Sequence, residues 1–191
     1  MAFMVLGTAC AEKQAKPDAQ PTTSQVKSIC ELSVMECYYH NVAKFDKKDA
    51  EGVLFWKKDK KFWVEYSGTV TVGVDASKVI MEINGSDVII TIPEAEVLGS
   101  TLDSSTLTKD SYIVAKESAA ITAEDEIAAL SAAQETMKKA AAEDKTLLAM
   151  AQQRAQQLLE DYVKNIGNAV GKSYSVKWKY LKENDTANTA A

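Results

Sequence analysis

TAEDEIAALSAAQETMKKAAAEDKTLLAMAQQRAQQLLEDYVKNI, residues 122–166, is the stretch that decides the fold. These 45 residues contain no Gly and no Pro, and eleven of them are Ala. Ala has the highest helix propensity and Gly and Pro the lowest, so the composition predicts a long helix. A helix of this length measures roughly 68 Å at about 1.5 Å per residue, more than twice the diameter of a small domain. Part of the helix must therefore extend beyond its own sheet or pack on another element.

The ends of this helix carry recognisable signals. Thr122 can act as the N-cap, and Asp125 stands where the acid of a capping box lies. Gly167 and Gly171 mark the far end. Asp144 interrupts the apolar pattern, and a bend there would let two shorter helices share one domain. The sequence leaves the continuous and the bent helix open.

The helix face can be divided into two heptad rows that are rich in Ala. The rows are Ile127, Gln134, Ala141, Leu148, Ala155 and Tyr162, and Leu130, Met137, Asp144, Ala151, Leu158 and Asn165. Small side chains bury little area, so the large apolar layers that fix a coiled coil are missing. The sequence therefore favours a helix that lies on the sheet of its own chain over self-association. Leu158 is expected in the core, and Ile127 in a thinly packed first half.

The N-terminal residues 1–10, MAFMVLGTAC, resemble the end of a bacterial lipoprotein signal, with Cys10 as the lipidated residue. The positive n-region is missing, and Leu6 stands four places before Cys10 where three are commoner; a start site downstream of the true one would explain the first defect. Residues 11–24 are polar, as a tether between anchor and domain should be. The alternative is a buried or frayed apolar N-terminus, which would leave the protein in the cytoplasm.

Composition predicts one domain at residues 25–181, followed by a polar tail at residues 182–191. A net charge of −5 argues against nucleic acid as a partner, because no basic excess is present to displace counterions. Charge is uneven, however, since residues 44–61 hold seven Lys and four acids. A solvated rim is the default interpretation of this stretch. Contact with an anionic envelope polymer or lipid is the alternative.

Two cysteines and the single histidine lie close together in the sequence. Cys30 and Cys37 are separated by no turn-forming residue, so their Cα atoms would stand too far apart for a disulfide. We expect both to be buried thiols. His40 stands three residues beyond Cys37, and on a strand these two positions face opposite sides, so neither a metal site nor a Cys–His nucleophile pair is expected.

The middle of the chain has the texture of an antiparallel sheet, preceded by a short helix at residues 26–32 that Ser24 would cap. The predicted strands are residues 34–45, 53–56, 62–74, 79–83, 88–92, 101–107 and 112–115. Polar turns are predicted at residues 46–49 and 57–61, and the clearest hairpin contains Asn84-Gly85. The fold class is therefore α+β: an antiparallel, curled sheet of short strands, with a long Ala-rich C-terminal helix.

A last strand at residues 173–181 closes this arrangement, because it alternates Tyr174, Val176, Trp178 and Tyr180 with polar residues. Trp178 is expected to pack near Trp56 or Trp63. An aromatic platform for sugar rings is the less favoured alternative for these tryptophans.

Several segments, in this order, resemble a family of bacterial, often membrane-anchored proteins known only as the domain of unknown function 4230 family. They are residues 32–44, Tyr66-Ser67-Gly68, Val72-Gly73-Val74-Asp75, Ser77-Lys78-Val79 and residues 92–98. The resemblance covers about residues 24–181 and implies a fold and a membrane setting, with no catalytic residues to carry over. The run from Val72 to Val79 also resembles the sheet of stomatin-like and prohibitin-like domains, which is an analogy of fold alone.

Two hypotheses about function follow. The favoured one is a lipid-anchored, non-enzymatic scaffold or partner-binding module on the extracytoplasmic face of the bacterial cell membrane, with an unidentified protein or envelope partner and no cofactor or metal. The other is a small-ligand-binding protein or enzyme with a site between helix and sheet. Its polar candidates, which would equally face a partner, are Asp75, Ser77, Lys78, Glu94 and Glu96.

Overall fold

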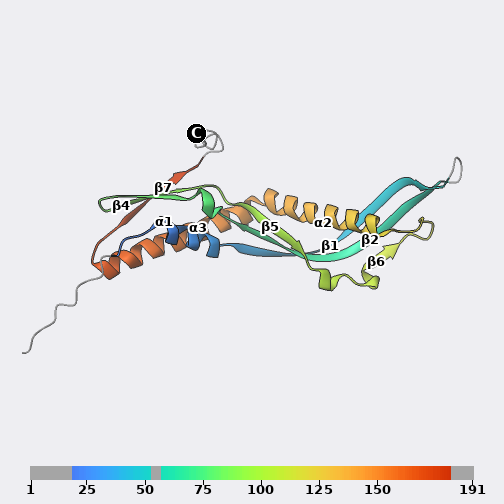
Figure 1. Ribbon diagram of the computed structural model, residues 1–191, viewed down its shortest axis with the longest axis horizontal. Helices are drawn as coiled ribbons and strands as arrows, with labels where there is room; N and C mark the ends of the chain where they lie inside the picture. Colours follow the sequence, from blue (N-terminus) through green and yellow to red (C-terminus); the bar gives the residue numbers. More distant parts are fainter. Residues whose placement is uncertain (1–18, 53–56, 182–191) are drawn as a thin grey trace, which may run out of the picture.

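The computed structural model describes residues 19–52 and 57–181 of the chain. In this part, α-helices pack against two separate sheets, and the molecule is elongated (Figure 1). The predicted α+β class is confirmed, including the antiparallel pairing, the long helical region near the C-terminus and the closing strand. None of the helices in this part combines the length and the apolar character that crossing a bilayer requires.

The first sheet contains β1 (Met35–Glu51), β2 (Lys58–Gly73) and β5 (Glu96–Leu102) in that order, and β6 (Tyr112–Val114) also pairs with β2. The second sheet contains β3 (Ile80–Asn84), β4 (Asp87–Ile92) and β7 (Ser175–Tyr180), with β7 parallel to β4. The helices are α1 (Thr23–Leu32), α2 (Ala123–Glu143) and α3 (Lys145–Val170), and the short 3₁₀ turns are η1 (Ala76–Lys78), η2 (Ser104–Thr106) and η3 (Lys109–Ser111).

Strands β1 and β2 form a long hairpin that projects at one end of the molecule (Figure 1). The turn predicted at residues 46–49 is wrong, because β1 continues to Glu51, and most of the charged run at 57–61 belongs to β2. Opposite charges across the ladder explain this extension, since Asp46 faces Lys61 and Glu51 faces Lys58. The strand predicted at residues 53–56 lies outside the described residues. The predicted Asn84-Gly85 hairpin is confirmed, with Gly85 at φ 63°.

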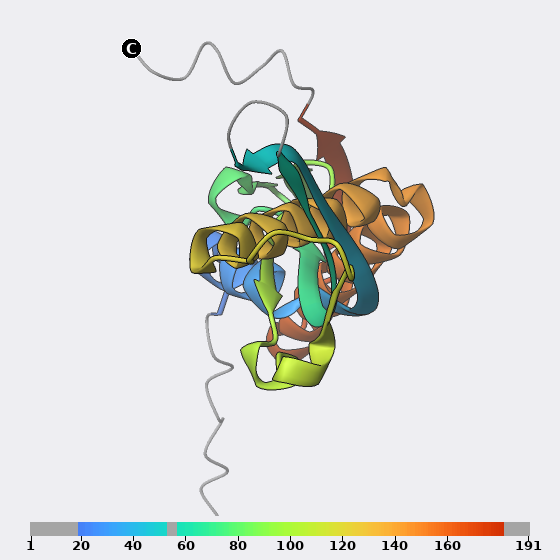
Figure 2. The same cartoon turned by 90° about the vertical axis from the view of Figure 1, so that its right-hand side faces the viewer.

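The long helix is bent at Asp144, which was one of the two predicted alternatives. The Asp144 backbone N–H donates to the Ala141 carbonyl (3.3 Å), and its Oδ1 accepts from the Leu147 N–H (3.0 Å). One residue therefore ends α2 and caps α3. Figure 2, seen from the hairpin end, shows α2 and α3 running in different directions. The capping box of Thr122 and Asp125 is confirmed, whereas α3 passes through Gly167 and ends before Gly171 at φ 70°.

The buried face of the helices repeats every four residues rather than in heptads. The buried positions are Asp125, Ala129, Ala133, Met137 and Ala141 on α2, and Ala151, Ala155, Leu159, Val163 and Gly167 on α3. A row with this spacing inclines to the helix axis, so the helices cross the strands at an angle. The expectation for Leu158 is therefore wrong: Leu158 is 37% exposed, and its neighbour Leu159 is fully buried.

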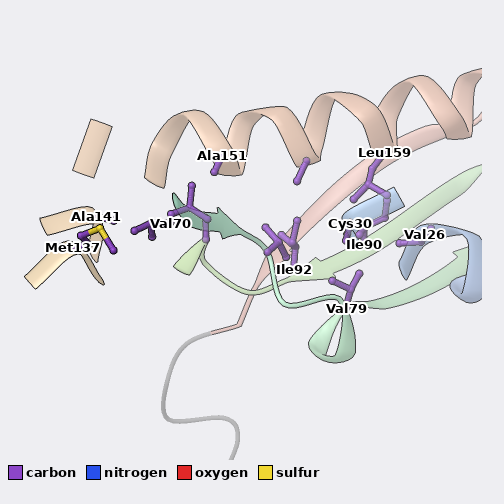
Figure 3. Packing of buried hydrophobic residues seen from close by; sticks show 14 of the residues in the cluster. Val26, Cys30, Val70, Val79, Ile90, Ile92, Met137, Ala141, Ala151 and Leu159 are labelled. Carbon is purple, nitrogen blue, oxygen red and sulfur yellow. The ribbon is translucent and has the colours of Figure 1, made fainter. Parts of the chain in front are cut away.

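The core joins α1, α3 and both sheets (Figure 3). Along α3, Ala151 lies near Val70 on β2 and Leu159 lies near Ile90 on β4, and all four side chains are fully buried. Alanine lets α3 approach closely, so the area buried comes mainly from the strand residues. On α2, Met137 packs on Gly68 so tightly that a Cβ at Gly68 would lie 2.6 Å from its Cε. Gly68 therefore provides the space for this methionine.

Helix α1 is tied to α3 by a tyrosine. Thr22, not the predicted Ser24, is the N-cap of α1, and its backbone N–H donates to the Tyr162 hydroxyl (3.2 Å), which in turn donates to Gln25 Oε1. The helix starts at Thr23, so residues 23 and 24, which were assigned to the predicted tether, are helical.

The closing strand β7 lies far from Trp63. Trp178 on β7 belongs to the second sheet and donates its Nε1–H to Glu160 Oε1 on α3 (3.0 Å). Trp63 lies in the first sheet and pairs with Ile113 of β6 near the hairpin end (Figure 1). The expected contact between Trp178 and Trp63 is therefore wrong, and Trp56 lies outside the described residues.

Candidate functional site

The structure brings four of the five predicted polar candidates together beside η1. Asp75 caps this turn, and its Oδ1 accepts from the Ser77 N–H (2.9 Å) and the Ser77 hydroxyl (2.6 Å). Lys78 Nζ lies 3.1 Å from Asp75 Oδ2 and 2.9 Å from Glu96 Oε1 on β5. Glu94 is exposed and makes no hydrogen bond or ion pair with the described residues, so it does not join the group.

The charged and polar side chains of this group interact mainly with one another. The hydrogen bond from the Ser77 hydroxyl is the main cause that lowers the pKa of Asp75, and the bonds to Glu96 and Asp75 raise the pKa of Lys78. Lys27 on α1 adds a hydrogen bond to the Ser77 carbonyl (3.1 Å). These groups satisfy one another at the surface, where water screens their charges. The cluster therefore has a structural role, because it connects α1, η1 and β5.

A second group of polar side chains lies on the outer face of the first sheet. His40 on β1 stands opposite Ser67 on β2, and His40 Nδ1 lies 3.0 Å from the Ser67 hydroxyl. His40 Nε2 lies 2.8 Å from Glu65 Oε1. These three residues line a cleft of about 300 Å³ together with residues of the η2–η3 segment: Thr106, Thr108, Asp110 and Ser111.

This cleft has the connectivity of a nucleophile, a base and an acid. With the imidazole proton on Nε2, Nδ1 accepts from Ser67 while Nε2 donates to Glu65. The His40 side chain is 67% exposed, so bulk water reaches the base. An open site gives little desolvation to strengthen these interactions. Sequence reasoning missed this group because Ser67 lies 27 residues from His40, and only the strand register brings them together.

A helix–sheet groove also exists, as the ligand-binding hypothesis requires. It lies between β5 and α2, measures about 650 Å³, and is lined by Val97, Leu98, Gly99, Ser100, Gln134, Glu135, Lys138, Lys139 and Ala142. The Gln134 amide donates to the Ser100 carbonyl (2.7 Å) across it. None of the five predicted candidates lines this groove.

The most buried charged groups are Lys60 on β2 and Asp125 on α2, whose side chains form an ion pair at 2.5 Å. Asp125 Oδ2 also accepts from the Thr122 N–H (3.0 Å) and hydroxyl (2.8 Å). The hydrogen bond from Lys60 is the main cause that lowers the pKa of Asp125 to about 2. The charged run at residues 57–61 predicts a solvated turn that includes Lys60, whereas the structure places Lys60 within β2 with its side chain buried. The pair fixes the start of α2 to the hairpin.

The cysteines and His40 do not converge. Cys30 is fully buried, and burial raises the pKa of its thiol to about 11. Cys37 is only half-buried, so the expectation that both thiols are buried is wrong for Cys37. Its side chain faces inward on β1 and that of His40 faces outward, as strand alternation predicts. Within residues 19–52 and 57–181, no three metal-binding side chains gather.

A groove of about 800 Å³ lies at the hairpin end. Its lining is rich in charge and comprises Lys57, Lys58, Asp59, Lys61, Ala115, Lys116, Glu117 and Ser118. The groove is shaped by two bonds between the segment after β6 and the start of β2. The Ala115 N–H donates to the Lys61 carbonyl (3.0 Å), and the Lys61 N–H donates to the Ser118 hydroxyl (3.0 Å).

Comparison with known proteins gives one match. A family model described as a protein of unknown function (DUF4230) matches residues 24–172. No curated protein and no solved structure matches the chain. The match begins at the second residue of α1 and ends just after α3, so it includes the first sheet, the bent helix and two strands of the second sheet.

Proposed function

Because the chain belongs to the DUF4230 family of proteins of unknown function, its role has to be argued from its own geometry, and we propose that it is a non-enzymatic scaffold or partner-binding module. In this proposal a lipid on Cys10 holds the protein on the extracytoplasmic face of the bacterial cell membrane. The elongated body then carries a docking surface away from that anchor.

One observation carries the proposal: the N-terminal end of the described chain and the β1–β2 hairpin lie at opposite ends of the molecule. The first described residues and α1 lie at one end, and the β1–β2 hairpin projects at the other (Figure 1). A chain anchored through residues before α1 would present the hairpin at the far end of the body. The predicted polar candidates give no support to catalysis, because Asp75, Ser77 and Lys78 engage one another.

The anchor is tested by expressing the full precursor in a bacterium and weighing the detergent-extracted protein. We expect a mature chain that begins at Cys10 and carries a lipid on its thiol. Cys10→Ser should abolish the modification and release the protein from the membrane fraction, whereas the matched control Cys37→Ser should stay anchored. An unmodified Cys10 with the N-terminal segment still attached would overturn the anchor.

The binding role needs a separate measurement. The anchored protein is isolated from its own membrane by affinity pull-down, with Cys10→Ser as the control. We expect the anchored chain to bring down a partner in a fixed ratio. The released Cys10→Ser chain should bring down less of this partner. A protein recovered alone in both forms would contradict the module.

A second candidate function, a serine hydrolase, is favoured by the cleft that contains His40, Ser67 and Glu65. A fluorophosphonate probe tests it: the Ser67 Oγ–P bond forms, the P–F bond breaks, fluoride leaves, and the hydroxyl proton passes to His40. If the candidate is correct, the probe labels Ser67, and His40→Gln reduces labelling by at least about tenfold. The matched control Ser77→Ala should label normally. A native protein that the probe leaves unlabelled excludes this chemistry.

A further inference from the structure

The hairpin end concentrates positive charge in an acidic protein. Between residues 44 and 61 the chain has seven Lys and four acids, although the whole chain carries a net charge of −5. Lys47 and Lys48 on β1 and Lys58 on β2 are exposed, and so is Lys116 after β6. The strand register places Lys47 opposite Lys60, so like charges face each other across the hairpin.

Ion pairs neutralise only part of this charge. Lys60 pairs with buried Asp125, Lys44 with Asp46 (3.5 Å), and Lys61 with Asp59 (3.3 Å). Lys47, Lys48, Lys58 and Lys116 make no ion pair with any residue that the structure describes, although Glu51 stands opposite Lys58 in the β1–β2 ladder. Their mutual repulsion would be relieved by an external anion.

The groove at this end brings two of these unpaired lysines together. Lys58 and Lys116 both line it, one from β2 and the other from the segment that follows β6. Lysine provides a compact charge with three donors on a flexible stem, which suits a phosphate whose orientation varies. At about 800 Å³, the groove has room for more than one small anionic group.

Apolar side chains stand beside the lysines. Ile113, which is 65% exposed, and Val114, which is 50% exposed, follow one another on β6 shortly before Lys116. They pair with Trp63 and Phe62, so their side chains project from opposite faces of this edge of the sheet. Exposed aliphatic side chains next to lysines are typical of surfaces that rest on anionic bilayers, where the lysines reach phosphates and the aliphatic groups enter the interface. A soluble polyanion offers nothing for Ile113 and Val114. The combination therefore favours a membrane over an anionic polymer.

We propose that the hairpin end, defined by Lys47, Lys48, Lys58, Lys116, Ile113 and Val114, is a docking surface for an anionic phospholipid bilayer. It lies at the end opposite α1, so this contact goes beyond the proposed function and does not require the lipid on Cys10. If both contacts form, the body stands between two membrane surfaces.

The test uses the full chain with Cys10→Ser, so that no attached lipid contributes to binding. Co-sedimentation is measured with phosphatidylcholine vesicles and with vesicles that also contain phosphatidylglycerol. We expect binding to the anionic vesicles only, and weaker binding at high salt. The double variant Lys58→Glu/Lys116→Glu should bind them at least about tenfold less tightly, since each lysine near an anionic surface contributes on the order of 1 kcal/mol.

The matched control is Lys164→Glu/Lys172→Glu, which makes the same charge change at exposed positions near the other end of the molecule. It should bind like the parent chain. Equal losses in both double variants would overturn the proposal, and so would a parent chain that does not bind anionic vesicles. Melting curves of both variants verify that each is folded.

The apolar part separates a bilayer from a soluble polyanion. Ile113→Ser should weaken vesicle binding several-fold and leave any binding to polyphosphate unchanged. If the parent chain binds polyphosphate as tightly as vesicles and Ile113→Ser changes neither, the surface serves an anionic polymer and the bilayer is excluded.

Discussion

Replacing Leu159 by Asp unfolds the protein, whereas the same change at Leu158 leaves it folded. Leu159 is fully buried among the residues of α1, α3 and β4, so the new carboxylate would lose its water without gaining a partner. The expected cost is at least about 3–5 kcal/mol, a large fraction of the stability of an ordinary domain. Thermal melts and circular dichroism of the two variants check it.

Leu158 is the matched control because it is also a leucine and stands next to Leu159 on the same helix. Its side chain is 37% exposed, and Asp there should cost no more than about 1 kcal/mol. Neither effect should depend on protein concentration, since the contacts of Leu159 lie within one chain. Severe unfolding by Leu158→Asp, or a melting temperature that rises with concentration, would show that the helix serves another chain.

Lys60→Met should lower stability by about 3 kcal/mol, because it leaves the Asp125 carboxylate buried without its cation. Methionine keeps most of the lysine stem, so the change removes chiefly the charge. Lys58→Met, two residues earlier on the same strand and exposed, is the matched control and should change stability by no more than about 0.5 kcal/mol. Denaturant unfolding of the three proteins near pH 7 measures both differences. Equal stability of the two variants would contradict a role for the pair.

The same pair predicts how stability depends on pH. The pKa of Asp125 is about 2 in the folded protein and about 3.9 in an unfolded chain, so the carboxylate stabilises the fold above pH 4. This contribution is lost as the pH falls from about 4 toward 2. In Lys60→Met the pKa of Asp125 rises, because the largest cause of its lowering is removed. The loss of stability between pH 4 and 2 should therefore be smaller in the variant than in the parent protein.

The start of the long helix and the place where it could bend were identified from the sequence because their signals are local, although the sequence left the bent and the continuous helix open. Thr122 and Asp125 are three residues apart, and the capping bonds of Asp144 reach no further than Leu147. The Asn84-Gly85 hairpin has the same local origin. Each of these features depends on a few neighbouring residues, whose preferences the sequence displays directly.

The choice between Leu158 and Leu159 could not be predicted, because it depends on the angle at which α3 crosses the sheet. A heptad row and a four-residue row share several positions and diverge along the helix. The heptad row that contains Ala151 continues to Leu158, whereas the four-residue row continues from Ala151 through Ala155 to Leu159. Only the packing partner decides which row faces the core.

The contacts of the polar groups could not be predicted either, because most of them join residues that are far apart in the sequence. Lys60 and Asp125 are 65 residues apart, and a lysine within a charged run looks solvated until its partner is known. The bond between Asp75 and Ser77 spans only two residues, whereas the contact of Lys78 with Glu96 depends on how η1 joins β5. Register alone placed His40 opposite Ser67.

Asp144 ends α2 and also caps α3, so its conformation determines the angle between the two helices. Helix α3 has 26 residues and extends roughly 39 Å from this single joint, at about 1.5 Å per residue. A change of only 10° at the joint would displace the far end of α3 by roughly 7 Å, and α1 and β7 would have to follow. A residue whose capping bond is worth about 1 kcal/mol thus sets the alignment of one half of the molecule against the other. Small sequence changes at this joint are therefore a means by which related chains could differ in curvature while keeping the same core.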